Sequence, residues 1–134
     1  MKRVLITLLA ISLSGCSTLL DAYLMKYDPN EYERIAEIRT SANLAKLQCD
    51  NYQESKNNAL SIANKTFGFV QFAQYVPRNE PVKKASVELD KIAQGLKEQY
   101  QKTDKVSAAF CKIKFNSIEN SAETIQKTIG NKPR

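Results

Sequence analysis

Apolar residues recur at steps of three and four over most of the chain, which is the spacing of one face of an α-helix. The pattern follows Asp28-Pro29, where Asp28 can cap a helix and Pro29 can occupy the first helical position, which needs no N–H donor. It then runs through Ile35, Ile38, Ala42, Ala45, Cys49, Tyr52, Ala59 and Ala63. The spacing predicts a long amphipathic helix over residues 29–75, with Leu44 and Leu47 widening its apolar face.

This first helix has one weak region. Asn57, Asn58, Asn64 and Gly68 all have low helix propensity. The sequence therefore also allows a break in the helix between residues 56 and 68.

The second half of the chain carries a similar pattern. Pro81 suits the start of a helix, and Gly130 followed by Pro133 suits its end. The apolar positions between them are Val82, Ala85, Leu89, Ile92, Leu96, Val106, Phe110 and Ile113, and then, one position over, Phe115, Ile118, Ala122, Ile125 and Ile129. We expect a helix over residues 82–129, with a break near residue 103 as one explanation of the shift, in which case Asp104 could cap a new helix.

The two helical halves meet at a Pro-rich stretch, residues 76–81. A turn there would fold the chain back on itself. The fold class predicted from the sequence is all-α, as an antiparallel helical hairpin or a small helical bundle.

Aromatic residues gather just before that turn, at Phe67, Phe69, Phe72 and Tyr75. Helix or irregular turn is the expected conformation, since a single strand would have no partner elsewhere in the chain. Two interpretations stay open: the four side chains complete the core near the turn, or they form an exposed patch that binds a partner peptide. The exposure of Phe69 and Tyr75 distinguishes the two.

The N-terminus reads as a targeting segment. Met1-Lys2-Arg3 is positively charged, residues 4–11 are an apolar run, and Leu13-Ser14-Gly15-Cys16 follows at once. This arrangement resembles the signal peptide of bacterial lipoprotein precursors, whose lipobox has an aliphatic residue, two small residues and then an obligatory Cys. An ordinary secretory signal or an uncleaved transmembrane helix is the alternative, although the apolar run is at the short limit for spanning a bilayer.

The resemblance implies that signal peptidase II cuts before Cys16 and that Cys16 carries acyl chains that anchor the protein in a membrane. Ser17 in place of Asp implies sorting to the outer membrane in an enteric-type host, with the domain facing the periplasm. The chain would then comprise a signal peptide (1–15), a short membrane-proximal segment (16–27) and a helical domain (28–134). The membrane-proximal segment would lie in the lipid interface or pack on the helices.

With Cys16 lipidated, Cys49 and Cys111 remain in a chain bound for an oxidising compartment, which favours a disulfide between them over two separate thiols. The turn at residues 76–81 lies midway between the two cysteines, so an antiparallel hairpin would bring them together. Closing a loop of this size would stabilise the fold by roughly 4 kcal/mol.

Composition excludes most kinds of catalytic site. The chain has 134 residues and no His, and no Gly-rich phosphate loop, nucleophile elbow or metal-spaced ligand cluster is present. We therefore expect a protein that is not an enzyme and holds no cofactor or metal. Basic residues outnumber acidic ones 11 to 6 from Val82 onward, which on an exported protein indicates a solvated surface or an anionic envelope partner rather than nucleic acid.

The expected function is that of a membrane-anchored envelope lipoprotein that binds or assembles another envelope protein. In form it resembles the small helical pilot lipoproteins of secretion systems, which implies that it could escort an outer-membrane secretion component. Two alternatives stay open: a phage- or plasmid-encoded lipoprotein acting as a lysis subunit or surface-exclusion factor, and a structural envelope protein that contacts peptidoglycan.

Overall fold

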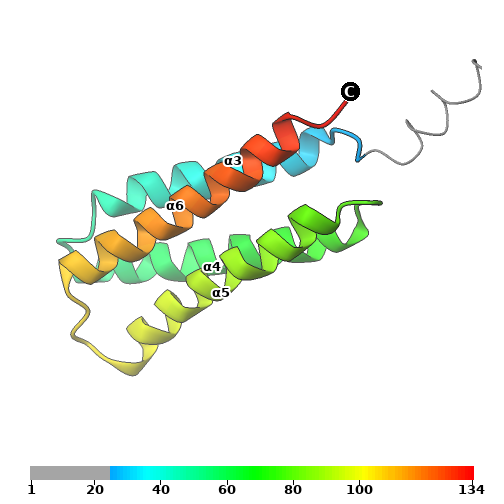
Figure 1. Ribbon diagram of the computed structural model, residues 1–134. Helices are drawn as coiled ribbons and strands as arrows, with labels where there is room; N and C mark the ends of the chain where they lie inside the picture. The colour runs from blue at the N-terminus through cyan, green and yellow to red at the C-terminus, as the bar shows by residue number, and fades with distance from the viewer. Residues whose placement is uncertain (1–24) are drawn as a thin grey trace, which may run out of the picture.

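The computed structural model describes residues 25–134, which form an all-helical bundle (Figure 1). Its helices are α3 (Pro29–Lys46), α4 (Tyr52–Tyr75), α5 (Glu80–Lys102) and α6 (Ala108–Gly130). The predicted all-α class and small helical bundle are confirmed. Cys16 and most of the expected membrane-proximal segment lie outside the described residues.

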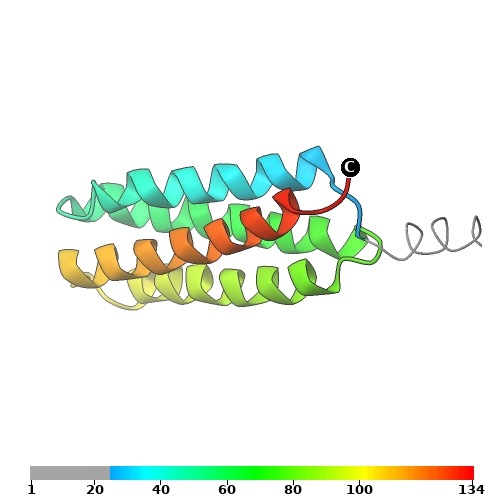
Figure 2. The same ribbon diagram turned by 45° about the horizontal axis from the view of Figure 1, so that its top comes forward.

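The bundle is a long helical hairpin that has been folded once across its middle. α3 packs mainly on α6 and α4 mainly on α5, and both views show these two pairs lying against each other (Figures 1 and 2). Contacts between the pairs come from α3 with α4 and from α5 with α6. The cross-section therefore has four helices, although the pairing is that of a two-helix hairpin.

Interacting residues lie almost symmetrically about residue 80 in the sequence. The hydrogen bonds that show it run from Tyr27 to Pro133, Arg39 to Gln126, Asn43 to Glu119 and Gln94 to Ala63. The turn expected at residues 76–81 is confirmed, since α4 ends at Tyr75 and α5 begins at Glu80. This register holds for the contacts within the α3–α6 and α4–α5 pairs.

The first helix breaks at a different place from the one expected. α3 ends at Lys46, and α4 then runs without interruption from Tyr52 to Tyr75, so the break allowed at residues 56–68 is wrong. Asn51 caps α4 by accepting a hydrogen bond from the Glu54 N–H at 3.2 Å. The cap and the contacts of α4 with α5 outweigh the low propensity of the Asn and Gly residues within α4.

The break expected near residue 103 is confirmed, because α5 ends at Lys102 and α6 begins at Ala108. Its cap is Ser107 rather than Asp104: the Ser107 hydroxyl accepts a hydrogen bond from the Phe110 N–H at 3.1 Å. Asp28 caps α3 as expected and accepts from the N–H groups of Asn30 (2.8 Å) and Glu31 (3.3 Å).

The core is a single apolar cluster along the bundle axis. Its bulkiest fully buried side chains are Tyr100, Phe69, Phe115, Ile35, Ile38, Ile62, Leu89, Leu96, Ile118, Ile125 and Ile129. Small residues, among them Ala42, Ala63 and Ala122, lie between the large ones and let the helices approach closely. Of the two stripes predicted for the second half, the later one, from Phe115 to Ile129, is buried throughout.

Four residues assigned to the apolar stripes are exposed instead: Leu44, Leu47, Phe110 and Ile113. All four lie near the breaks at 47–51 and 103–107. Because each break changes the direction of the chain, a residue that continues the helical spacing beyond it no longer faces the same neighbour. Leu44 precedes its break and lies off the face of α3 that buries Ala42 and Ala45. Within the described residues, no helix is long and apolar enough to cross a membrane.

Candidate binding surfaces

The two ends of the bundle differ in chemistry. The proximal end holds residue 25, the start of α3, the α4–α5 turn and the end of α6, and the disulfide end holds the α3–α4 and α5–α6 connections (Figures 1 and 2). Every surface considered below belongs to one of these ends or to the outer face of α4.

A buried polar cluster closes the proximal end. The Lys132 ammonium donates to Glu31 Oε2 at 2.6 Å and to Asn79 Oδ1 at 2.7 Å, and the Asn79 amide donates to the other carboxylate oxygen of Glu31. The side chains of Glu31 and Lys132 are almost wholly shielded from solvent. The cluster joins the first turn of α3, the residue before α5 and the segment after α6.

The charges of Glu31 and Lys132 compensate each other in this cluster, and the side-chain amide of Asn79 forms hydrogen bonds with both. A buried ion pair is stable only if its partners and its remaining hydrogen-bonding atoms are satisfied, and here each residue contacts both of the others. Sequence patterns gave no sign of this cluster, because the three residues are far apart in the sequence and Glu, Asn and Lys are usually found at exposed positions.

The incoming segment packs on the helices where it is described. The Tyr27 N–H donates to Pro133 O at 2.9 Å, and the Tyr27 ring lies 5.9 Å from that of Tyr32. The Arg134 guanidinium lies 5.4 Å from the centroid of the Tyr27 ring. Residues 25–27 and 133–134 therefore form one continuous surface at the proximal end.

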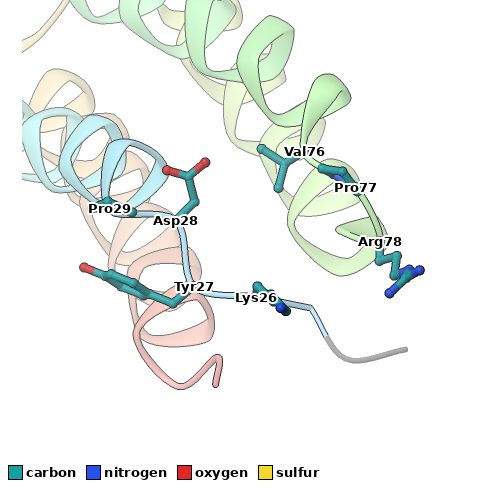
Figure 3. A pocket seen from close by; sticks show the side chains of 7 residues that line it. All are labelled: Lys26, Tyr27, Asp28, Pro29, Val76, Pro77 and Arg78. Atoms are coloured by element: carbon teal, nitrogen blue, oxygen red, sulfur yellow. The ribbon is translucent and has the colours of Figure 1, made fainter. Parts of the chain in front are cut away.

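A shallow hollow of about 360 Å³ lies beside this surface. Figure 3 shows Lys26, Tyr27, Asp28 and Pro29 on the incoming segment and Val76, Pro77 and Arg78 on the facing α4–α5 turn. The lining is mostly apolar and carries the basic groups of Lys26 and Arg78. The side chain of Asp28 is engaged by the two backbone N–H groups that it caps.

Arg78 has an unusual backbone conformation. Its φ is 56°, and among the described residues it is the one non-glycine residue with a positive φ. This left-handed conformation costs an L-residue roughly 1 kcal/mol, and Gly or Asn normally occupies it. The turn therefore carries a strained arginine where glycine would adopt the same conformation without strain.

At the other end, Cys49 and Cys111 form a disulfide with a Cα–Cα distance of 5.7 Å. This pairing was predicted from the sequence. Cys49 lies in the α3–α4 connection and Cys111 in the first turn of α6. The bond therefore links the α3–α4 connection to the start of α6.

Beside the disulfide lies an exposed surface that we call the apolar patch, made of Leu44, Leu47 and Ile113. Their exposed fractions are 59%, 75% and 64%. Leu47 and Ile113 line one hollow together with Lys46 and Lys112, and Leu44 lies one turn before Leu47 on α3. The patch is the largest group of exposed aliphatic side chains within the described residues.

Both lysines at the patch are paired with carboxylates. Lys46 contacts Glu119, and Lys112 contacts Asp50 at 3.3 Å. The Lys112–Asp50 pair is largely exposed, and such pairs are weak and exchange easily with other partners. A partner could therefore replace Asp50 with its own carboxylate while covering the apolar side chains.

The aromatic segment at residues 67–76 is divided between core and surface. Phe69 is 1% exposed and belongs to the core, so the prediction that it contributes to a binding patch is corrected. Phe72 is half-buried beneath the Arg34 guanidinium, 4.8 Å from its ring centroid. Phe67 and Tyr75 are exposed, at 54% and 86%, but helical geometry separates them by two turns.

The tyrosine pair near the disulfide is the other polar feature of the interior. Tyr52 and Tyr100 have ring centroids 5.5 Å apart, and Tyr52 donates to Thr103 O at 3.1 Å. Burial raises the pKa of Tyr100, and the nearby Ser55 hydroxyl offsets part of that rise. The buried Tyr100 hydroxyl makes no hydrogen bond.

Residues 25–134 contain no group of three or more His, Cys, Asp or Glu side chains that could hold a metal ion. Comparison with protein-family models, with curated proteins and with solved structures finds no match.

Proposed function

We propose that the protein is a lipid-anchored envelope lipoprotein whose bundle is a non-catalytic binding module. Two observations support the proposal: the sequence at residues 13–16, which resembles a lipobox, and the Cys49–Cys111 disulfide, a bond that persists in exported proteins and is rare in the cytosol. In a Gram-negative host the anchor would place the bundle at the outer membrane, facing the periplasm.

The main support for a binding role is the position of the apolar patch. Leu44, Leu47 and Ile113 lie at the disulfide end, whereas residue 25, which leads toward Cys16, lies at the proximal end. α5 has 23 residues and is therefore about 35 Å long. An anchored bundle could thus present the patch a helix length away from the membrane surface.

The chemistry of the patch indicates its partner. Three aliphatic side chains flanked by Lys46 and Lys112 suit an apolar peptide segment that also carries acidic side chains. A helical or extended segment of a secretion component would fit this description. Binding such a segment is the role of a pilot lipoprotein. The binding surface proposed here replaces the one expected at residues 67–76.

The test is in-cell cross-linking with a photoreactive amino acid placed at Leu47 or at Ile113. Positions Phe67 and Lys91 on α4 and α5 serve as exposed controls. We expect one discrete protein adduct from the patch and none from the controls. Equal adducts from all four positions, or adducts with glycan alone, would refute the binding role and favour a structural protein that contacts peptidoglycan.

A specificity control uses charge. Lys112→Glu places a negative group at the rim of the patch and leaves the core residues unchanged, since the Lys112 side chain is about half exposed and lies outside the core. The proposal predicts a weaker adduct from Ile113 in this variant. Lys91→Glu, a matched change far from the patch, should leave the adduct unchanged.

A further inference from the structure

The proximal end of the bundle carries basic groups from three separate parts of the chain. Lys26 lies on the incoming segment, Arg78 on the α4–α5 turn and Arg134 after α6, and all three are exposed. Of the acidic groups at this end, Glu31 pairs with Lys132, Asp28 caps α3 and Glu80 pairs with Lys83 at 3.1 Å, whereas Glu33 is exposed. The surface at this end is therefore positively charged.

Apolar and amphipathic groups accompany these charges. Tyr75, the last residue of α4, is 86% exposed, and Val76 and Pro77 line the hollow beside Lys26 and Arg78. Tyrosines with an apolar ring and a polar hydroxyl favour the boundary between lipid and water. This end thus combines the two kinds of group that bind a lipid surface, basic side chains and interfacial aromatics.

The length of chain outside the described residues restricts what this end can meet. Eight residues lie between Cys16 and Met25, and the nine residue-to-residue steps from Cys16 to Met25 span roughly 30 Å when fully extended. If Cys16 is lipidated, the proximal end must stay within that distance of the membrane. Because the tether keeps this end near lipid, even weak binding to lipid would be strengthened by a high effective concentration.

The strain at Arg78 supports a role for that side chain. The buried cluster holds Asn79, the residue after Arg78, and the left-handed φ of Arg78 is maintained beside it. Backbone strain of this kind persists where the surrounding structure enforces it, often at functional positions. An arginine retained at a position where glycine would avoid the strain is consistent with use of its guanidinium.

We infer that the proximal end docks on an anionic phospholipid surface, with Lys26, Arg78 and Arg134 contacting headgroup phosphates and Tyr75 entering the interface. The inference depends on the proposed lipid anchor and extends it, because it assigns an orientation to the bundle. The docked bundle stands with its disulfide end and its apolar patch directed away from the membrane.

The test uses the lipidated full chain in vesicles. The sequence has no Trp, so Tyr75→Trp introduces a single fluorescent reporter at the proximal end and Leu47→Trp a matched reporter at the disulfide end. Both native side chains are exposed, so both variants should fold. In vesicles with anionic lipid, we expect the emission of the Trp at 75 to shift to the blue and to be quenched when the lipid is brominated. The Trp at 47 should show neither effect.

Charge variants then measure the docking equilibrium. A basic side chain near an anionic membrane contributes about a fivefold factor to binding, so Lys26→Gln, Arg78→Gly and Arg134→Gln together should weaken docking roughly a hundredfold. The matched control removes three basic groups elsewhere, through Lys91→Gln, Lys102→Gln and Lys105→Gln, and should leave quenching of the Trp at 75 unchanged.

The outcomes separate this inference from the anchor itself. A protein that does not float with the vesicles at all contradicts the anchor. A protein that floats but shows no quenching at position 75, or equal quenching at 75 and 47, overturns the docking inference alone. Quenching that is independent of anionic lipid also overturns it, because the basic side chains would then have no role.

Discussion

The two ends of the bundle are closed by different means. At the disulfide end a covalent bond joins Cys49 to Cys111, whereas at the proximal end Glu31, Asn79 and Lys132 form a buried polar cluster. The covalent link acts mainly by restricting the unfolded chain, and the cluster acts only in the folded state. The same fold is therefore stabilised in two ways: the disulfide destabilises the unfolded state, and the polar cluster stabilises the folded state. Each contribution can be removed separately by mutation.

The largest effect is expected at the disulfide. Cys49 and Cys111 are separated by 62 positions, so replacing both with Ser should lower the free energy of unfolding by roughly 4 kcal/mol. Urea unfolding followed by circular dichroism measures the loss. Wild-type protein treated with a reductant should match the double variant, and a loss below about 1 kcal/mol would contradict the importance of the bond.

A somewhat smaller effect is expected from the polar cluster. Lys132→Met leaves the Glu31 carboxylate buried without its cation, which should cost about 3 kcal/mol. The same urea titration measures this variant.

The control for that change removes the remaining charge. In the double variant Glu31→Gln with Lys132→Met, the amide at 31 can still bond with Asn79 and no buried charge is left unpaired, so we expect much of the lost stability to return. A double variant as unstable as Lys132→Met would show that the cluster acts through packing rather than through charge compensation.

The tyrosine pair offers a contrast within the disulfide end. Tyr100→Phe removes a buried hydroxyl that makes no hydrogen bond and should leave stability unchanged or raise it by up to about 1 kcal/mol. Tyr52→Phe removes a hydroxyl that donates to Thr103 O and should lower stability by about 1 kcal/mol. Thermal unfolding of the two variants at neutral pH compares them directly, and equal losses would contradict the assignment.

Alkaline pH gives the same pair a second test. Burial raises the pKa of Tyr100 in the folded state, so the unfolded chain loses this proton first and folding stability falls as the pH rises through about 10 and above. At lower pH the Tyr100 hydroxyl keeps its proton in both states, so its contribution to the free energy of unfolding does not change with pH. Tyr100→Phe should therefore lose less stability than wild type between pH 9 and 11, and parallel curves would contradict the shift.

The smallest effect concerns the strained turn. Arg78→Gly relieves a left-handed φ but makes the unfolded chain more flexible, so the two effects nearly cancel and stability should stay equal or rise by up to about 1 kcal/mol. A loss of more than about 1 kcal/mol would mean that the Arg78 side chain stabilises the fold.

Much of the fold could be predicted because it depends on local signals. Helical spacing indicated the class, Asp28-Pro29 marked the start of α3, and the Pro-rich stretch at residues 76–81, midway between Cys49 and Cys111, indicated the turn. The hairpin argument gave the correct partners, because folding a hairpin across its middle preserves the pairing of residues symmetric about residue 80.

The break at residues 47–51 could not be predicted in the same way. The apolar spacing continues through Cys49 to Tyr52, so spacing alone gives no sign that the helix stops at Lys46. The local signal at this break is Asn51, which caps α4 by accepting from the Glu54 N–H. The same missed break hid the apolar patch, since Leu44 and Leu47 fit the helical stripe and appear buried from spacing alone. The buried cluster was missed because contacts between distant polar residues leave no periodic pattern.

The central claim is that the protein is anchored by lipid at Cys16 with its bundle held close to the membrane. Mass spectrometry of the mature protein from the envelope of an expressing bacterium tests it most directly. The account predicts an N-terminal peptide that begins at Cys16 and carries acyl chains, and a Cys16→Ala variant that accumulates as the unprocessed precursor. A wild-type chain with an unmodified Cys16, or the same processing in Cys16→Ala, would contradict it.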